Sequence, residues 1–426
     1  MTKNAFILNF FKFYNILWSI ALPFLGKDKR LQKGFKKRIS NSHHKRADLW
    51  IQAASAGEAY LAVFLVKNFS PRARCRILVT STTSQGINIL KQHLSGSVLD
   101  QHIHLSLEWF PFDQPAIMKE AVEKIAPKVM VLLETEIWPA LLFHLKQKKT
   151  HIIIINARLS KKSYFGYLKT RFFWKHLHPD MIMAVSELDA QRYQSIFDKS
   201  DIKTMHNIKF ESLDMESSSD SCDVSVNLAS HKDVPFTLFA SVRKPEAKQI
   251  TEIIRQIICQ HPKQVIAIFP RHLNHLRFWE NTLSNQDIEF ELRSSLTDNL
   301  SKPGVILWDK FGELKQVYKQ AEIVFVGGSL KPLGGQNFIE SAITGAVTII
   351  GPFYDDFFWV GEELFIQDIV LKKRTTAEII SAILYFLNQP SNRSDRKKMA
   401  QKYIAAHCGG TRQAVNEISK ILNPVV

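Results

Sequence analysis

The chain has 426 residues, of which 45% are hydrophobic and 23% charged, an ordinary globular composition that excludes a fibrous or wholly disordered protein. Lys and Arg number 56 against 40 Asp and Glu, a formal charge of +16, which favours anionic partners such as lipid headgroups or phosphorylated substrates. The four cysteines are far apart and form no CxxC pair, so neither a disulfide framework nor a cysteine zinc site is expected.

The N-terminal residues 1–26 are predicted to form a membrane anchor. Residues 5–25 read AFILNFFKFYNILWSIALPFL, long enough as a helix to cross roughly 30 Å of hydrocarbon. Nine Lys or Arg residues and one acid lie in the basic segment 27–46, and such a segment stays cytoplasmic and binds an anionic membrane surface. The helix either spans the bilayer or lies in its interface. The alternative is an N-terminal helix packed on a soluble domain.

From residue 49 onward, apolar runs with strand character alternate with amphipathic stretches such as residues 85–93 and 113–125. This alternation indicates parallel sheets covered by helices on both faces. The predicted fold class is α/β, with two Rossmann-like domains at residues 27–211 and 235–405 that face a cleft. A Ser- and Asp-rich linker at 212–234 joins them, and a C-terminal helix at 406–426 packs back on the N-terminal domain. The predicted strands are 49–54, 76–80, 129–133, 151–156, 181–185, 236–240, 265–269, 304–308, 323–326 and 347–350.

Carboxylates follow two of the predicted strands. In the AASAGE segment, Ser55 and Gly57 allow the backbone to turn close to a ligand, and Glu58 stands at the positive end of the next helix. There Glu58 can act as a general base, or it can simply cap the helix. In LLETEIWP, Glu134 and Glu136 follow the predicted strand 129–133, and a second acid at the same sheet edge could orient an acceptor or tune Glu58. The alternative is a surface turn before a helix.

Basic and amide side chains follow other strands. Arg158 in NARLS suits an anionic group, or it forms a surface salt bridge. Asn207 and Lys209 in NIKF could hold a phosphate or a sugar carboxylate, or they form a polar strand edge. In PRH, Arg271 fits phosphate recognition and is followed by His272. His272 and His275 are three residues apart, but no third ligand is evident, so no metal is expected.

The strongest single signal is a strand that runs into a glycine-rich turn, FVGGS, followed by GGQNFIE, where a second glycine pair opens a helix. Backbone N–H groups and a helix dipole favour a phosphate there, and Glu340, one turn into the helix, could bind ribose hydroxyls. The pattern is neither a GxGxxG fingerprint nor a Walker motif. The alternative is that the glycines serve tight packing alone. The candidate binding residues are Gly327, Gly328, Ser329, Gly335, Asn337 and Glu340.

Taken in order, these segments resemble the family of 3-deoxy-D-manno-octulosonic acid (Kdo) transferases of lipopolysaccharide synthesis. The resemblance covers most of residues 5–355. Besides the apolar N-terminus, it rests on AASAGE (53–58), TSTTSQG (80–86), PFD (111–113), LLETEIWP (132–139), NARLS (156–160), SE (186–187), NIKF (207–210), ASVRKPE (240–246), PRH (270–272), DKFGEL (309–314), FVGGSL (325–330), GGQNFIE (334–340) and GP (351–352).

The resemblance implies a GT-B glycosyltransferase fold, CMP-Kdo as donor and a lipid A precursor as acceptor. It implies an inverting transfer at the cytoplasmic face of the inner membrane, without a metal or another cofactor. By similarity, Glu58 matches the general base, and Glu136 and Glu134 match acids that support the acceptor site. Asn207 and Lys209 match residues near the donor. The residues that match the CMP site are Arg271, Gly328, Ser329, Asn337 and Glu340.

The chain departs from the family pattern at a few positions. Gln336 stands where a His is usual, His206 stands where a Gly is usual, and ASVRKPE replaces a commoner Ser-Thr-His form. Two other functions therefore stay open: a related GT-B transferase with a different donor or acceptor, and a non-catalytic membrane-surface binding protein on the same scaffold. The basic residues are not interleaved with stacking aromatics in one patch, so nucleic acid is not expected as a partner.

Overall fold

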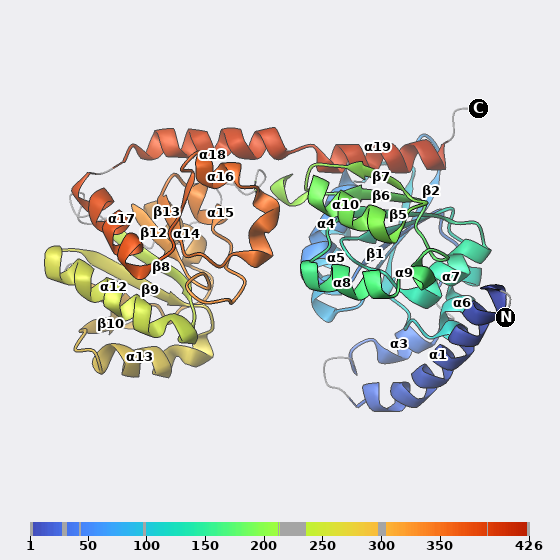
Figure 1. Ribbon diagram of the computed structural model, residues 1–426, viewed down its shortest axis with the longest axis horizontal. Helices are drawn as coiled ribbons and strands as arrows, with labels where there is room; N and C mark the ends of the chain where they lie inside the picture. Colours follow the sequence, from blue (N-terminus) through green and yellow to red (C-terminus); the bar gives the residue numbers. More distant parts are fainter. Residues whose placement is uncertain are drawn as a thin grey trace. The chain divides into compact units, whose positions relative to one another are not determined.

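The computed structural model describes residues 3–27, 32–41, 44–96, 99–211, 213, 236–296, 304–389 and 391–423, with side chains from residue 7 onward. The chain divides into two compact units, coloured along the sequence in Figure 1: unit 1 comprises Met1–Ser212 and His407–Val426, and unit 2 comprises Leu213–Ala406. The predicted linker at 212–234 lies outside the described residues, apart from Leu213.

Unit 1 is built on a parallel sheet whose described strands follow the order β3-β2-β1-β4-β5-β6-β7. Its central strands are largely apolar because their side chains alternate between two cores, with Trp50 in one and Leu49 and Ile51 in the other. The strand order reverses beside β1, which pairs with β2 on one side and with β4 on the other. The strands are β1 (Leu49–Ala53), β2 (Cys75–Ser81), β3 (Ile103–Trp109), β4 (Val129–Leu133), β5 (His151–Ala157), β6 (Met181–Ala184) and β7 (Asp201–Thr204).

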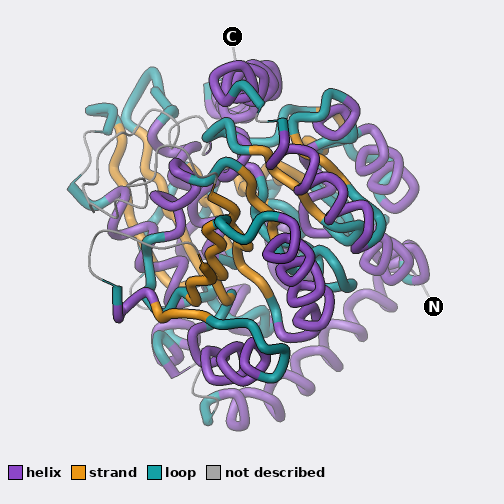
Figure 2. Tube along the Cα trace, turned by 90° about the vertical axis from the view of Figure 1, so that its left-hand side faces the viewer, coloured by secondary structure: helices purple, strands orange, loops and turns teal. Residues whose placement is uncertain are grey.

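Helices cover both faces of this sheet. Figure 2, in which unit 2 faces the viewer, shows helices beside the strands of that unit. One core of unit 1 receives side chains from α4 (Ala56–Lys67), α5 (Ser84–Leu94) and α19 (Gly410–Leu422). The opposite core receives them from α1 (Lys3–Leu25), α6 (Pro115–Ile125), α7 (Pro139–Gln147), α9 (Arg171–Trp174) and α10 (Glu187–Ile196). Two further helices of this unit are α3 (Phe35–Ile39) and α8 (Lys161–Lys169).

The helix α1 has two different sides. Among the described residues it is the only helix long and apolar enough, by length and composition, to cross a membrane. One side packs on unit 1: Phe11 lies 4.3 Å from Phe143 between ring centroids, and the Tyr14 hydroxyl donates to Asp113 at 3.1 Å. The other side is exposed and mostly apolar, although it also carries Asn9, Lys12 and Ser19. We call its apolar part the apolar stripe, and it consists of Leu8, Phe13, Ile16, Leu17, Ile20 and Phe24.

Unit 2 repeats the architecture of unit 1. Its described strands form a parallel sheet in the order β10-β11-β9-β8-β12-β13-β14, so the order reverses beside β8. The strands are β8 (Phe236–Val242), β9 (Val265–Pro270), β10 (Phe290–Leu292), β11 (Gly304–Leu307), β12 (Ile323–Val326), β13 (Val347–Ile350) and β14 (Val370–Lys372). The helices are α12 (Ala247–Gln260), α13 (Leu276–Ser284), α14 (Leu314–Gln320), α15 (Ile339–Ala342), α16 (Glu363–Ile366), α17 (Thr376–Asn388) and α18 (Arg393–His407).

These two sheets confirm the predicted α/β fold class, and each predicted apolar run coincides with a strand to within a few residues. The prediction missed β3, β7, β10 and β14, which are the strands at the four sheet edges. It also placed the helix after the second glycine pair too early. That helix, α15, begins only at Ile339 and has four residues, so Glu340 lies in its first turn rather than one turn inside it.

Candidate functional site

The candidate acids of unit 1 gather where its strand order reverses. Ser55, Gly57 and Glu58 follow β1, whereas Glu134 and Glu136 follow β4, and these two strands are neighbours. In open parallel sheets, ligands bind beyond the carboxyl ends of the strands at this switch point. The fold therefore brings both acidic segments to the edge where a substrate site is expected.

Glu58 is fixed by a reciprocal cap at the start of α4. The Ser55 hydroxyl accepts from the Glu58 amide at 3.2 Å and donates to Glu58 Oε1 at 2.9 Å, while the Ala54 amide donates to Glu58 Oε2 at 2.7 Å. The carboxyl group is buried, and desolvation raises its pKa although these hydrogen bonds oppose the rise. The helix cap that was the alternative to a catalytic role is thus present. Each carboxylate oxygen still has a lone pair beyond those bonds, so the cap and a proton-accepting role are compatible.

Glu134 is held by an ion pair with Lys209. The Lys209 ammonium lies 2.5 Å from Glu134 Oε1. The loop that carries Lys209 is tied to β5, because the buried Asn156 side chain accepts from the Ile208 amide at 2.9 Å. Asn207, in the same loop, accepts from the Lys209 amide at 3.0 Å. The predicted NIKF residues therefore lie beside the predicted acids, although the two segments are far apart in the sequence.

Glu136 has the most perturbed acidity of the group. Burial raises its pKa from 4.5 to about 7, and the neighbouring charge of Glu58 adds to the rise. The indole N–H of Trp138 donates to Glu136 Oε2 at 2.6 Å, and this bond opposes the shift. Clustered acids with raised pKa values in one place are typical of sites that move protons.

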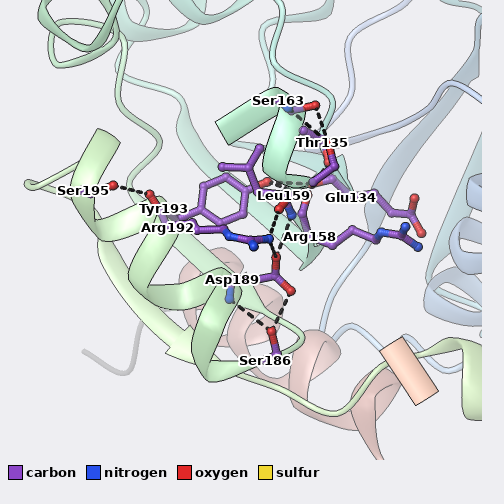
Figure 3. A network of polar contacts seen from close by, with 11 residues as sticks. Glu134, Thr135, Arg158, Leu159, Ser163, Ser186, Asp189, Arg192, Tyr193 and Ser195 are labelled. Carbon is purple, nitrogen blue, oxygen red and sulfur yellow. Dashed lines mark hydrogen bonds and ion pairs between the residues drawn. The ribbon is translucent and has the colours of Figure 1, made fainter. Parts of the chain in front are cut away.

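A polar network behind the site fixes the loops that carry Glu134 and Arg158 (Figure 3). The Tyr193 hydroxyl donates to the Arg158 carbonyl at 3.2 Å and lies 3.4 Å from the Glu134 carbonyl. The Thr135 hydroxyl also donates to the Arg158 carbonyl. Figure 3 shows the Glu134 and Arg158 side chains extending the same way, away from Tyr193. The sequence analysis did not single out Tyr193, because it lies on α10 and meets these loops only in the folded sheet.

The glycine-rich turn of unit 2 contains a feature that the sequence analysis did not foresee. The carboxylate of Glu246, fully buried, accepts from the Gly328 amide at 2.7 Å and from the Leu330 amide at 2.8 Å. It also accepts from the Arg243 amide at 3.1 Å. Gly327 has no room for a side chain, because a Cβ there would lie 2.6 Å from the Val242 Cα. The amide of Gly328, a residue predicted to bind phosphate, and the amide of Leu330 are thus already occupied by an acid of the chain itself.

The remaining unit 2 candidates follow β9 and the second glycine pair. Arg271 and His272 are exposed just beyond β9. The side-chain amide of Asn337 donates to Glu340 Oε1 at 2.6 Å, so this predicted pair is in direct contact. Gly335 takes a left-handed φ of 82° and Gly328 one of 73°, conformations that favour glycine. The Ser329 hydroxyl donates to the Val326 carbonyl at 2.6 Å, which braces the turn from within.

Residues 29–212 match the family model described as 3-Deoxy-D-manno-octulosonic-acid transferase (kdotransferase). The chain is 24% identical over 418 residues to a 3-deoxy-D-manno-octulosonic acid transferase of Rickettsia conorii, an alignment that covers 97% of this chain and 87% of that protein. It is 29% identical over 396 residues to a bifunctional glycosyltransferase/methyltransferase of Fusobacterium nucleatum. That alignment covers 89% of this chain and 59% of the longer relative.

The chain is a relative of the Kdo transferases. It is accordingly a glycosyltransferase, and the family match spans every candidate residue of unit 1. The fold agrees with this assignment. A crystal structure of a glycosyltransferase from Rickettsia africae covers 90% of this chain and 100% of its own, with a TM-score of 0.59 at 11% identity, a likeness of fold. Among the described residues, no group of three or more His, Cys, Asp or Glu side chains could hold a metal ion.

Proposed function

We propose that this glycosyltransferase moves Kdo from CMP-Kdo to a lipid A precursor, with inversion and without a metal, at the cytoplasmic face of the inner membrane. The proposal is supported by the ordered sequence blocks and by the relatives described as Kdo transferases. The apolar stripe of α1 and the basic segment 27–46 are consistent with work at a membrane surface.

In the proposed reaction, Glu58 accepts the proton of the acceptor hydroxyl as its oxygen bonds to the anomeric carbon of Kdo. The bond between that carbon and the phosphate oxygen breaks on the opposite face, and CMP leaves with the electron pair. The observation that carries this role is the geometry of Glu58: a buried carboxyl at the switch point, with a raised pKa and both oxygens oriented by fixed donors. A base with a pKa moved toward the working pH transfers protons more effectively.

The other acids of unit 1 then serve the acceptor side. Lys209 neutralises Glu134, so that pair can bind sugar hydroxyls without adding a second full charge beside Glu58. Glu136, with its pKa of about 7, exists partly as the neutral acid near neutral pH and can donate a hydrogen bond. Arg158 extends in the same direction as Glu134 and could meet an acidic group of either substrate. In unit 2, the proposed donor residues are those named above, from Arg271 to Glu340.

The test compares transfer from CMP-Kdo to a lipid A precursor by wild type, Glu58→Gln and Glu58→Ala. We expect kcat to fall by roughly 10²-fold or more in both variants, the scale of a general base. The Glu58→Gln variant retains a side-chain oxygen that accepts from the Ala54 amide, so it separates loss of the base from loss of the cap. The matched control is Glu123→Gln, which removes a half-exposed carboxylate of α6 from the same unit.

The outcomes distinguish the competing functions. Equal rates for wild type and Glu58→Gln would mean that the base is another group. Release of CMP without transfer would point to a different acceptor, and transfer from a UDP-sugar in place of CMP-Kdo would point to a different donor. A protein that binds nucleotide equally well in every variant and transfers nothing would be a binding protein on this scaffold.

A further inference from the structure

The loops after β8 and β9 in unit 2 bring a group of cations together at one sheet edge. Val242 pairs with Pro270, and the Arg271 amide donates to the Val242 carbonyl at 2.9 Å, so Arg243 and Arg271 leave the sheet side by side. These strands are labelled next to each other in Figure 1. We call this group the cation cluster, and it consists of Arg243, Lys244, Arg271, His272 and His275.

The charged members of the cation cluster are not held in ion pairs with any described residue. Within the described ranges, Arg243, Lys244 and Arg271 form no ion pair, and Lys244 and Arg271 are exposed. The pKa of His275 is lowered, first by desolvation and then by the charges of Lys244, His272 and Arg243. These side chains are therefore close enough to interact electrostatically. Such a concentration of unpaired cations attracts anions.

The acid closest to the cluster in sequence does not neutralise it. Within the described part of the chain, the Glu246 carboxylate accepts from three backbone amides, those of Arg243, Gly328 and Leu330. The same contacts remove two amides of the glycine-rich turn from any role in binding a ligand anion. Anion recognition on this side of unit 2 therefore falls to side chains rather than to these two amides.

The spacing of the cluster suits a ligand with two neighbouring acidic groups. Adjacent parallel strands lie about 4.8 Å apart, so cations at their two exits are held roughly one strand spacing apart. In CMP-Kdo the anomeric carbon carries a carboxylate directly and the phosphate through one oxygen, so the two anions are a few bonds apart. A phosphate alone would contact the cations at the end of only one strand. CMP-Kdo can place one anion at the end of β8 and the other at the end of β9.

We propose that Arg243 and Lys244, at the exit of β8, bind the carboxylate of the donor's sugar acid while Arg271, at the exit of β9, meets its phosphate. The inference rests on the proposed function and adds to it the residues that distinguish a sugar-acid donor from a neutral one. A guanidinium can bind a carboxylate through two parallel hydrogen bonds, and a lysine adds a mobile second charge. Arg243 is pre-positioned, because its guanidinium donates to the Leu333 carbonyl at 3.1 Å.

The experiment measures the KM for CMP-Kdo, the KM for the lipid acceptor and the inhibition constant of CMP, which has the phosphate but lacks the carboxylate. The variants are Lys244→Gln, the primary one, and Arg243→Gln. We expect each to raise the KM for CMP-Kdo roughly tenfold or more, the effect of losing a charged hydrogen bond. The inhibition constant of CMP should stay within about threefold, and Lys248→Gln, an exposed lysine on the following helix α12, should change neither.

Each other outcome overturns the assignment. An equal rise in the CMP constant would mean that these residues hold the nucleotide or brace the turn through Leu333. A rise confined to the KM for the acceptor would assign the cluster to phosphates of the acceptor lipid. No change in any constant would make the cluster a solvated surface. If wild type transfers nothing from CMP-Kdo, the proposed function itself fails; if wild type is active, only the assignment of Arg243 and Lys244 is at stake.

Discussion

At the scale of single residues, the acidity of Glu136 has a consequence for stability. Its pKa is raised from 4.5 to about 7, so between these values the folded protein keeps a proton that the unfolded chain releases. Stability therefore falls as the pH rises through this window, by up to roughly 3 kcal/mol at 1.36 kcal/mol for each pKa unit. Above the window, the folded state carries a buried charge beside Glu58.

We predict that Glu136→Gln flattens this dependence. In urea unfolding at pH 5 and pH 8, wild type should lose about 2 kcal/mol more than the variant between the two pH values. The half-exposed Glu123→Gln serves as the control and should follow wild type. If the variant loses as much stability as wild type, Glu136 is ionised without penalty and its burial does not perturb it.

The sequence could locate Glu58 and Glu136 because each stands directly after an apolar strand, and strand ends meet at one edge of a parallel sheet. It could not reveal Glu246. The amides that it binds belong to Gly328 and Leu330, more than 80 residues further along the chain. The residue three positions before Glu246 is Arg243, and not the Ser or Thr of the usual capping signature. Contacts of this kind are decided by strand order, which only the folded sheet provides.

At the scale of elements, three of the four strands that the sequence missed are incompletely buried, whereas β14 is mostly buried but has only three residues. The burial of β3 alternates or is partial along its length, and β7 is mostly exposed. An edge strand contacts one neighbour and little core, so its sequence need not form the apolar run by which buried strands are recognised. The central strands, in contrast, are largely apolar on both faces, and the predicted runs match them to within a few residues.

The helix α1 leads to a prediction about membrane binding. Because one side packs on unit 1, we expect that a helix which keeps these contacts would lie along a membrane and present its apolar stripe to lipid. We predict that Phe13→Glu with Ile20→Glu weakens sedimentation with vesicles containing phosphatidylglycerol by roughly tenfold or more, since each side chain loses its burial in lipid. The matched control is Phe311→Glu with Phe358→Glu, two exposed aromatics of unit 2.

A second variant distinguishes a helix in the interface from one that spans the bilayer. Phe11 packs on Phe143 and Phe173, so Phe11→Ala should lower the stability of vesicle-bound protein by about 3 kcal/mol if the helix stays docked. A spanning helix would leave unit 1, and the same substitution would then leave unfolding of the bound protein unchanged.

At the scale of the whole molecule, unit 1 is completed by the other end of the chain. The helix α19 buries Ala414, Val415 and Ile418 against the core shared with α4 and α5. Its start is joined to the loop that carries Lys209, because Glu211 accepts from the Gly409 amide at 3.0 Å and from the Thr411 amide at 2.8 Å. Gly410 lies so close to this loop that a Cβ would be 2.1 Å from the His206 carbonyl oxygen.

We therefore predict that residues 1–212 alone, in detergent, are much less stable than unit 1 in the full chain. The loss of the α19 side chains removes on the order of 5 kcal/mol of apolar burial, comparable with the whole stability of an ordinary domain. A synthetic peptide of residues 407–426 should raise the melting temperature of the fragment in a concentration-dependent way, as a ligand of the folded state does. A peptide carrying Ile418→Lys is the matched control and should have little effect, because a lysine cannot be buried at that site without cost. If the fragment melts at the same temperature with and without the unmodified peptide, α19 adds nothing to the fold of unit 1, and the contacts of Glu211 with it do not position the Lys209 loop.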